Sequence, residues 1–600
     1  MSSKTLRAIA ATVILAGIAI AAAAQFGNSD PSSLEIQAPL GTMAGADDSP
    51  ATTARQEFEY RVGLLSGLTT DNFWAYIGDQ PTAWNAYVLG PTKPALFALT
   101  SDQTSLVTEL AANETVPVAA EDGEWIVEVD LSSDLAWSDG VDITAQDLAF
   151  TFDAVRRLGL QGGWAEVFPP EVKAIVALSP SRLQIDFTGR PSLRVWPYGV
   201  GLAPIMPSHV WEPLLQTVGS AGALYAMSGE PDVSGGPLAL SEIGESEIVA
   251  VANPGYPGTA ADRVRYRIYS DEAAAVAALS AGAIDTILSP TGLSQASASS
   301  LEGVEGVAID ESPANAVRYL GFNLKREPMS SDYFRKALAL LLDREQTAAR
   351  FVPDSDPAFT MMSPSNDTWF DESVATEIAS GFGGTLESRL VAALDPLRSA
   401  GYQWAQEPSV KDGQLVAGTG LTISGLPPAP LTILTPGEEY DPVRPQYAGE
   451  IEKTLETLGF DVRSVVTDFD TVVDLAFNAG EDGARHYDMY LLGWTLGNPS
   501  LPAYYRWFFA PDAPANSTGY SDVEFAAELA QFEQASDLVQ AKGSLWRMER
   551  ILAQDLPYLV LYHPEIVEAY RSDRVDFGIR GALGGIQGRL GGLTDLNPLL

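Results

Sequence analysis

Cysteine is absent from this chain of 600 residues. Its absence excludes disulfides, thiolate metal ligands, cysteine nucleophiles and the acylated cysteine of a lipoprotein. Histidine is scarce as well: the chain has only His209, His486 and His563, and none lies in an HExxH arrangement or near a second histidine. Because zinc sites in proteins draw on several histidine or cysteine ligands, we expect no metal site.

Basic residues are also few, with 36 Lys and Arg against 78 Asp and Glu and a net charge of −42. Nucleic acid is not expected as a partner, because phosphate binding needs clustered basic residues. A solvated acidic surface suited to a saline habitat explains this charge, and attraction of cationic ligands is the alternative. The hydrophobic fraction of 46% is typical of a globular protein, and the length predicts two or more domains.

Long apolar runs are missing except at the N-terminus. Lys4 and Arg7 precede an apolar run over residues 8–24, and the alanines that end it resemble a signal peptidase site. We therefore predict a signal peptide over residues 1–24, with an uncleaved anchor as the alternative. The small, polar and acidic residues 25–57 predict a flexible acidic tether. The protein is accordingly expected to be exported and to act on the outer side of the cytoplasmic membrane, in the periplasm or at the cell surface.

Catalytic sequence motifs are missing too. The chain has no GxSxG elbow, no GxxxxGK[ST] phosphate loop and no dinucleotide-binding glycine pattern. The acidic pairs Asp354/Asp356 and Asp468/Asp470 lack the glycine and the terminal glutamate of a calcium loop. A carboxylate pair for glycoside hydrolysis stays open in so acidic a chain, so a secreted hydrolase such as a glycosidase is the alternative function. A structural surface protein is a third hypothesis.

The most informative stretch that is present covers residues 125–155. Alternating apolar residues over 125–131 predict a half-buried strand, and Ser-Asp-Gly at 138–140 is a turn signal. Thr144 and Asp147 then form a capping-box pattern, followed by apolar residues at helical spacing. The stretch therefore predicts a strand, a turn and a helix in succession.

This stretch resembles the signature of the extracellular solute-binding proteins of family 5, the oligopeptide, dipeptide and nickel group that serves ABC importers. Glu128 and Asp130 stand where the family usually has Lys or Arg, and Trp137 stands where it usually has Phe. Further blocks resemble the family in the same order, and the resemblance extends at intervals over residues 58–580. These blocks lie at residues 204–210, 235–256, 264–285, 320–323, 341–344, 400–413 and 556–562.

The resemblance implies an α/β fold like that of the periplasmic binding proteins. Two α/β lobes with mixed sheets are joined by hinge strands, and lobe one is discontinuous in sequence and carries an extra subdomain. The implied hinge strands lie near residues 312–322 and 556–566. The implied boundaries are 58–315 for lobe one with a subdomain inserted near 85–230, 316–560 for lobe two, and 561–600 for the return to lobe one and a C-terminal tail.

The function that the resemblance implies is that of a substrate-binding protein of an ABC importer. Such a protein captures a small ligand between its lobes and delivers it to the transmembrane subunits of the permease. A peptide or peptide-like ligand is the commonest cargo in the family. We expect no enzyme activity, no cofactor and a monomer.

The resemblance also suggests where the ligand binds. In the family the ligand-reading residues cluster in the loop after the strand that here contains Tyr490. Phe73 and Trp74 stand in a predicted loop over residues 72–76, which tends to face the ligand in the family. The aromatic cluster could equally belong to the core, and for each residue alone burial in the core is favoured. The candidate ligand-binding residues are Trp494, Asn498, Tyr490, Tyr504, Phe73, Trp74 and Asn323.

One departure from the family pattern bears on the ligand. Peptide-binding members carry an aspartate just after the aromatic residue, and it pairs with the free α-amino group of the peptide. Here Thr495 and Leu496 follow Trp494. Because a buried ammonium without a partner costs several kcal/mol, we hypothesise that Trp494 lines the site and that no free α-amino group is required. A non-peptide ligand with neutral polar groups would then fit. The alternative is that Trp494 belongs to the core and another acidic residue holds the amine.

Overall fold

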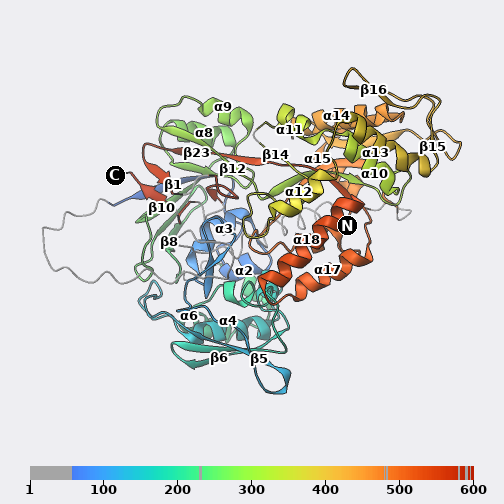
Figure 1. The fold of residues 1–600 in the computed structure, drawn as a ribbon. Coiled ribbons are helices and arrows are strands. Elements are labelled where there is room, and N and C mark those ends of the chain that lie inside the picture. The colour runs from blue at the N-terminus through green and yellow to red at the C-terminus, as the bar shows by residue number, and fades with distance from the viewer. Residues whose placement is uncertain are drawn as a thin grey trace.

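The computed structural model describes residues 57–600 apart from 229–232, 354, 439, 479, 481–483, 579–580, 588–591, 595 and 600 (Figure 1). The predicted signal peptide lies outside the described residues, as does the predicted tether up to residue 56. No helix in the described part of the chain is long and apolar enough to cross a membrane.

Lobe one is built on a seven-stranded sheet with the strand order β12-β23-β11-β1-β10-β9-β8. Its first strand runs parallel to both neighbours, whereas the strand from near the C-terminus runs antiparallel to its neighbours, so the sheet is mixed. Helices α8 (Glu272–Ser280) and α9 (Gln295–Leu301) pack on it (Figure 1). The strands are β1 (Glu59–Leu64), β8 (Leu238–Ile243), β9 (Glu247–Ala252), β10 (Arg263–Ile268), β11 (Thr286–Leu288), β12 (Val307–Pro313) and β23 (Glu565–Arg571).

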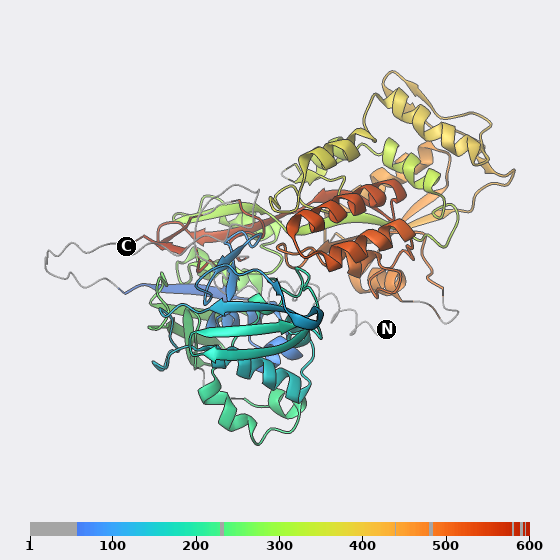
Figure 2. The same ribbon diagram turned by 60° about the horizontal axis from the view of Figure 1, so that its bottom comes forward.

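A subdomain is inserted between the first two chain segments of this sheet. Its four-stranded antiparallel sheet has the order β4-β5-β7-β6 and packs on helix α4, with the opposite face open in Figure 2. Smaller elements of this region lie between this sheet and lobe one. The elements are α2 (Phe73–Gly78), α3 (Ala83–Leu89), β2 (Phe97–Leu99), β3 (Leu106–Thr108), β4 (Val118–Ala119), β5 (Trp125–Asp130), α4 (Ala145–Leu158), α5 (Gly163–Val167), β6 (Val172–Ser179), β7 (Arg182–Phe187), α6 (Ser208–Leu215) and α7 (Ala221–Tyr225).

The predicted strand, turn and capped helix of residues 125–155 are confirmed as β5, the turn and α4. The Asp147 carboxylate accepts the Thr144 N–H at 2.8 Å, which closes the capping box, and it also accepts the N–H of Ser208 at the start of α6. The expected loop at residues 72–76 was wrong: these residues begin helix α2. The cause is Asn72, whose side-chain oxygen caps the helix by accepting from Trp74 N–H.

Lobe two is built on a six-stranded mixed sheet with the order β14-β22-β13-β21-β19-β20. A β-α-β unit lies at one edge of this sheet, since β19 and β20 are parallel and α14 connects them. The strands are β13 (Ala316–Phe322), β14 (Asp356–Pro357), β19 (Leu431–Pro436), β20 (Val462–Thr467), β21 (Met489–Thr495) and β22 (Tyr558–His563).

Helices cover both faces of this sheet. One face carries α10 (Asp332–Leu341), α11 (Arg344–Phe351), α13 (Leu386–Ser399) and α14 (Val443–Thr457). The other carries α15 (Phe469–Phe477), α16 (Tyr504–Phe509), α17 (Val523–Gln534) and α18 (Leu538–Asp555), with α12 (Glu372–Ser380) packed on α18. The remaining strands form three small ladders: β15 (Tyr402–Gln403) with β18 (Thr422–Ile423), β16 (Ser409–Lys411) with β17 (Gln414–Val416), and β24 (Val575–Phe577) with β25 (Leu596–Pro598).

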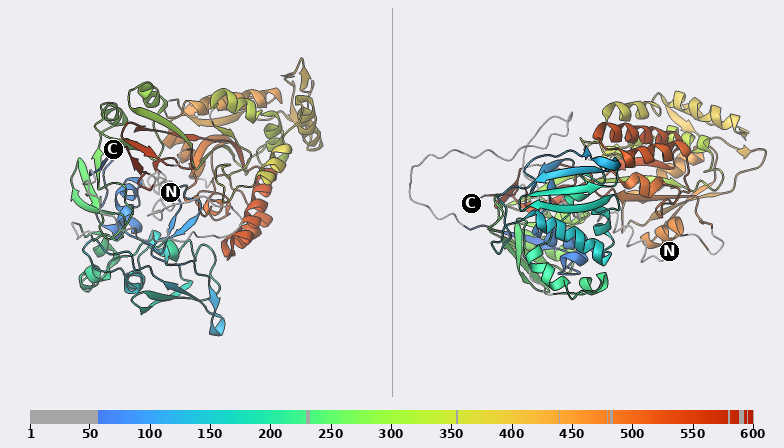
Figure 3. Two further views of the ribbon diagram at one scale, coloured as in Figure 1. Left: turned by 60° about the vertical axis from the view of Figure 1, so that its left-hand side comes forward. Right: turned by 90° about the horizontal axis from the view of Figure 1, so that it is seen from below.

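The chain crosses between the two lobes at two adjacent points. Residues 314–315 join β12 to β13, and Pro564 joins β22 to β23. The Ala314 N–H donates to the Pro564 carbonyl oxygen at 3.0 Å, so the crossings lie side by side. The lobes extend to either side of this connection (Figures 1 and 3). The predicted fold class is therefore confirmed: two mixed α/β lobes, hinge strands, and a discontinuous lobe one with an extra subdomain.

A buried histidine ties the two crossings together. His563 Nδ1 lies 2.9 Å from the Ala316 carbonyl oxygen, to which it donates, and its Nε2 has no partner among the described residues. Burial lowers the pKa of His563, against a weaker opposing effect of Asp356 on the neighbouring strand. The folded state therefore favours the neutral ring. The stability that this provides is present above the ordinary histidine pKa of about 6.5 and is lost as the pH falls below it.

We predict that His563→Asn, which keeps a side-chain N–H but cannot take up a proton, weakens this pH dependence. The free energy of unfolding, measured with urea from pH 8 to pH 4.5, should fall less steeply in the variant below pH 6.5. The difference in slope is at most about 1.4 kcal/mol per pH unit, the value for one proton. The exposed His486→Asn serves as the control. A difference between His563→Asn and the wild type that does not change with pH would contradict the prediction.

Candidate functional site

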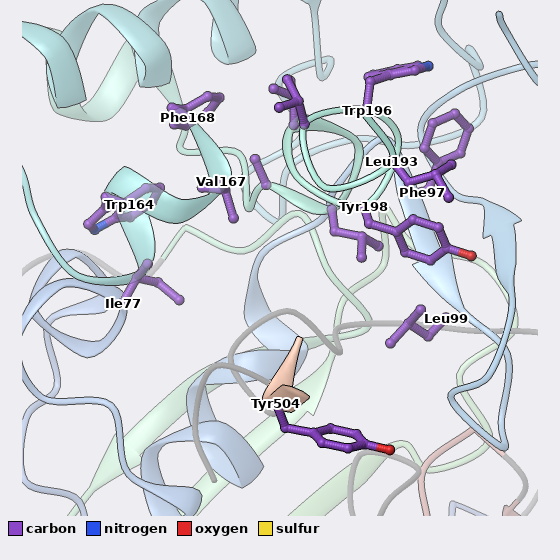
Figure 4. Close-up of a cluster of buried hydrophobic side chains, with 14 of the residues drawn as sticks. Ile77, Phe97, Leu99, Trp164, Val167, Phe168, Leu193, Trp196, Tyr198 and Tyr504 are labelled. Atoms are coloured by element: carbon purple, nitrogen blue, oxygen red, sulfur yellow. The ribbon is translucent and has the colours of Figure 1, made fainter. Parts of the chain in front are cut away.

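The two lobes also meet on the side away from the hinge. The Leu193 N–H donates to the Ala535 carbonyl oxygen at 2.7 Å, and the Ser105 and Thr368 hydroxyls are 3.2 Å apart. One continuous cluster of buried apolar side chains runs from the subdomain to the lobe-two face that carries α15 to α18. Figure 4 shows Tyr504 of α16 beside Leu99 of β2. This face of lobe two is therefore the candidate binding surface between the lobes.

Three tyrosines from adjacent strands form the centre of this surface. The rings of Tyr319 and Tyr558 stack with centroids 3.9 Å apart, and Tyr490 contacts Tyr319 edge-on at 5.9 Å. The Tyr490 hydroxyl hydrogen-bonds the Ser517 hydroxyl. Gly321 makes room for this arrangement, because a Cβ there would lie 2.5 Å from Tyr490 Cζ. Burial raises the pKa of both Tyr319 and Tyr490 well above the ordinary value, so these hydroxyls stay neutral.

Trp494 continues the aromatic surface at the end of β21. Its ring stacks on Phe508 at 4.7 Å with an interplanar angle of 19°, and it contacts Phe477 edge-on at 5.6 Å. Its indole Nε1 is buried and finds no acceptor within the part of the chain that the structure describes. A buried donor without an acceptor costs about 1–3 kcal/mol. An acceptor on a ligand would remove that cost.

A buried carboxyl group supports the surface from below. Glu549 of α18 accepts the N–H groups of Met361 and Met362 at 3.1 and 3.0 Å and a hydrogen bond from the Tyr505 hydroxyl. Burial raises the pKa of Glu549. Tyr505 in turn stacks on Tyr504 with centroids 4.5 Å apart. The carboxyl group therefore holds α16 and the 361–362 segment in place, which positions Tyr504.

A small cavity lies between Glu549 and the sheet. Its volume is about 10 Å³, room for one water molecule, and its lining includes Arg344, Glu549 and Tyr558. The Arg344 guanidinium lies 3.9 Å from the centroid of the Phe359 ring, and burial lowers the pKa of Arg344 to about 9. The cavity is too small for a peptide, so we assign it to the support of the surface.

The structure brings Tyr490 and Tyr504 into the apolar cluster that spans lobe two and the subdomain, with Trp494 packed against it. Asn498 lies in the loop that follows β21, where its side-chain oxygen accepts from the N–H and the hydroxyl of Ser500 at 2.8 and 2.7 Å. The side-chain N–H of Asn315, at the hinge, donates to the Gly497 carbonyl oxygen at 2.7 Å, which ties this loop to the crossing.

The other predicted residues have clear structural contacts. Phe73 packs edge-on against Tyr76 at 5.3 Å and lies under the Lys93 ammonium, also at 5.3 Å. Trp74 is fully buried between Trp164 and Trp211, with ring centroids 4.9 and 5.9 Å away. For Trp74, burial in the core was the stated alternative, and a ligand contact stays a prediction.

The side chain of Asn323 forms its hydrogen bonds with backbone groups. Its amide donates to the carbonyl oxygens of Arg485 and Tyr487 at 3.2 and 2.9 Å, and its side-chain oxygen accepts from Lys325 N–H. These bonds fix the end of β13 against the residues before β21. A ligand contact by Asn323 also stays a prediction.

Sequence reasoning missed Tyr319, Tyr558 and Phe508. The two tyrosines lie in segments recognised as strands, but their ring contact depends on the pairing of β13 with β22. Nothing local in the sequence reveals that pairing. Among the described residues, no group of three or more His, Asp or Glu side chains could hold a metal ion.

Comparison with known proteins identifies the family. The sequence profile of the bacterial extracellular solute-binding proteins, family 5 Middle, matches residues 107–516, more than half of the chain. The oligopeptide-binding protein AppA of Bacillus subtilis (strain 168) is 21% identical over 475 residues, covering 78% of this chain and 80% of the relative.

Solved structures share the fold. A periplasmic EDTA-binding protein, EppA, superposes with a TM-score of 0.67 at 18% identity, over 90% of this chain and 96% of its own. A periplasmic oligopeptide-binding protein from Thermotoga maritima gives a TM-score of 0.67 at 20% identity, over 91% and 100% of the two chains. The resemblance inferred from the sequence is thus confirmed, and the chain belongs to the bacterial extracellular solute-binding proteins, family 5.

Proposed function

We propose that this chain is the substrate-binding protein of an ABC importer, which captures a small ligand between its lobes and delivers it to the permease. One observation carries the proposal: aromatic side chains of lobe two belong to or pack against the apolar cluster that spans both lobes, and the indole N–H of Trp494 has no acceptor among the described residues. A hinge of two adjacent crossings joins the lobes. Members of the family are solute-binding proteins, which favours binding over the secreted hydrolase alternative.

The hinge gives the proposal its mechanism. A ligand that contacts both lobes binds the closed arrangement more tightly than an open one, and it therefore shifts the population towards closure. To shift the ratio of closed to open from 1:99 to 99:1, the ligand must prefer the closed form by about 10⁴-fold, or about 5.5 kcal/mol. Aromatic stacking and hydrogen bonds formed away from water are suited to supply this difference. The closed monomer then docks on the permease, and no cofactor takes part.

The ligand class follows from the neutral chemistry of the surface. Its donors include indole and phenol groups, and Thr495 and Leu496 follow Trp494 at the position of the expected carboxylate. One relative is named as an oligopeptide-binding protein and one structural neighbour as an EDTA-binding protein. We propose a peptide or peptide-like ligand held by stacking and neutral hydrogen bonds, without a requirement for a free α-amino group.

We predict that ligand binding raises the melting temperature and compacts the protein. A thermal-shift screen of peptides, N-acetylated peptides, sugars and amines should find a stabilising ligand, because a ligand that binds only the folded state adds to its stability. X-ray scattering should then give a smaller radius of gyration with the ligand than without it. An unchanged radius would contradict hinge closure, and turnover of the ligand would contradict a pure binding role.

We predict that Trp494→Phe weakens binding of this ligand about fivefold while leaving the melting temperature of the free protein nearly unchanged. The variant keeps a ring to stack on Phe508 and loses an N–H that has no acceptor among the described residues, and one such hydrogen bond is worth about 1 kcal/mol. Trp546→Phe is the matched control: its Nε1 donates to the Trp369 carbonyl oxygen at 3.1 Å, so its loss should lower stability and leave affinity unchanged. Calorimetry measures both affinities.

A companion measurement tests the charge requirement. The affinity for a peptide and for its N-acetylated form should agree within a few-fold if the α-amino group is not read. Tight binding of free peptides that is lost on acetylation would overturn that part of the proposal.

We predict that the protein is exported and that its mature form starts near Gln25. The charged start and the apolar run over residues 8–24 support this. Cell fractionation followed by N-terminal sequencing of the extracytoplasmic species checks it. Retention of residues 1–24 on a membrane-bound species would favour the anchor, and full-length protein in the cytosol would contradict export.

A further inference from the structure

A cluster of positive charge lies on the opposite face of lobe two, close to the hinge. Arg318 of β13 and Arg444 of α14 both face Asp441, with Nε–Oδ2 distances of 3.9 and 2.8 Å. The Arg444 side chain is 7% exposed, that of Asp441 is 15% exposed and that of Arg318 is 25% exposed. Two guanidinium groups, which stay charged in proteins, thus share one carboxylate in a largely buried setting. The cluster carries an excess of one positive charge in a protein of net charge −42.

The cluster also holds hydrogen-bond donors without acceptors. Arg318 Nε, Arg444 Nη1 and the Tyr447 hydroxyl are all buried and have no hydrogen-bond acceptor among the described residues. Tyr447 lies one turn after Arg444 on α14, and its ring stacks on Tyr562 of β22 with centroids 5.2 Å apart. Buried unsatisfied donors are rare in folded proteins, and several in one place indicate a water or an ion that satisfies them.

Asp441 cannot supply the missing acceptors. Its other oxygen, Oδ1, already accepts the backbone N–H groups of Val443 and Arg444 at 3.0 and 3.4 Å, at the start of α14. Burial, together with the charge of nearby Arg318, lowers the pKa of Arg444 against the opposing effect of Asp441. A second negative charge would strengthen that opposing effect.

The arrangement is built into the hinge strands. Arg318 and Tyr562 are cross-strand partners of β13 and β22. Arg318 lies three residues after Asn315 and Tyr562 two residues before Pro564, the residues at which the chain crosses between the lobes. Gly493 on β21 leaves room for the arginine, because a Cβ there would lie 2.5 Å from Arg318 Cδ. Tyr440 covers Arg444, whose Cζ lies 5.3 Å from the ring centroid.

We propose that Arg318, Arg444 and Tyr447 bind a small inorganic anion beside Asp441 and thereby brace the hinge end of lobe two. The anion accepts from the guanidinium and hydroxyl donors that lack partners, and it balances the excess charge. Chloride and a tetrahedral oxyanion such as sulfate share this chemistry, since both accept several N–H and O–H bonds. The site lies on the sheet face away from the aromatic surface, so it is separate from ligand capture.

The test is the unfolding midpoint at constant ionic strength, with sodium methanesulfonate exchanged for sodium chloride in one arm and for sodium sulfate in the other. The wild type should show a saturable rise in midpoint with the anion that binds, because binding to the folded state alone adds stability. Arg444→Gln and Arg318→Gln should lose that rise. The matched control is Arg463→Gln on β20, where a side chain that is 77% exposed carries the same charge. It should keep the rise and report the general effect of each salt.

A further variant separates anion binding from a purely structural role. Asp441→Asn keeps the oxygen that caps α14 but removes the competing charge, so the apparent affinity for the anion should increase. Equal anion responses in Arg444→Gln and Arg463→Gln, or no saturable rise in the wild type, would overturn the proposal.

If the arginine variants fail to fold, crystals of the wild type soaked in bromide decide the matter for halides, and selenate decides it for oxyanions. An anomalous peak within hydrogen-bond distance of Arg318 and Arg444 supports the proposal. The absence of a peak in both soaks would refute it.

Discussion

The two points at which the chain crosses between the lobes lie side by side, and this pairing determines how the lobes are connected. The hydrogen bond from Ala314 to Pro564 and the contact from His563 to Ala316 hold the crossings together, so the lobes share a short, defined connection. The stacking of Tyr319 on Tyr558 depends on this connection. Tyr319 and Tyr558 come from the two strands that leave this connection, and they stack only because the strands pair in one register. The hinge thus sets both the connection between the lobes and the arrangement of the stacked tyrosines on lobe two.

Local sequence signals predicted much of the architecture. The capping box of Thr144 and Asp147 could be predicted from spacing, because neighbouring residues determine it, and the hinge strands could be predicted from the resemblance to the family. Helix α2 was missed for a local reason: a short run of aromatic residues has no helical stripe, and only the cap by Asn72 makes it helical. Short helices of this kind depend on a single side chain.

The candidate site was less accessible to prediction than the fold. Resemblance located the loop after β21, and with it Trp494, but the partners of that ring come from α15 and α16. The cluster of positive charge could not be predicted from the sequence, since Arg318, Asp441 and Arg444 are brought together only by the packing of α14 on the sheet. Two strand glycines make room for these contacts: a Cβ at Gly321 would collide with the Tyr490 ring, and a Cβ at Gly493 would collide with the Arg318 side chain. A glycine inside a strand is therefore a sign of close packing whose partner the sequence alone does not identify.

The place of β23 in lobe one has a consequence for biogenesis. This strand lies between β12 and β11 in the seven-stranded sheet, yet it comes from residues 565–571, near the end of the chain. A ribosome therefore releases all the other strands of the sheet before it makes this one, and β12 has no place in the sheet until then. Although domains usually fold as they emerge, the sheet of lobe one is complete only once residues 565–571 have been made.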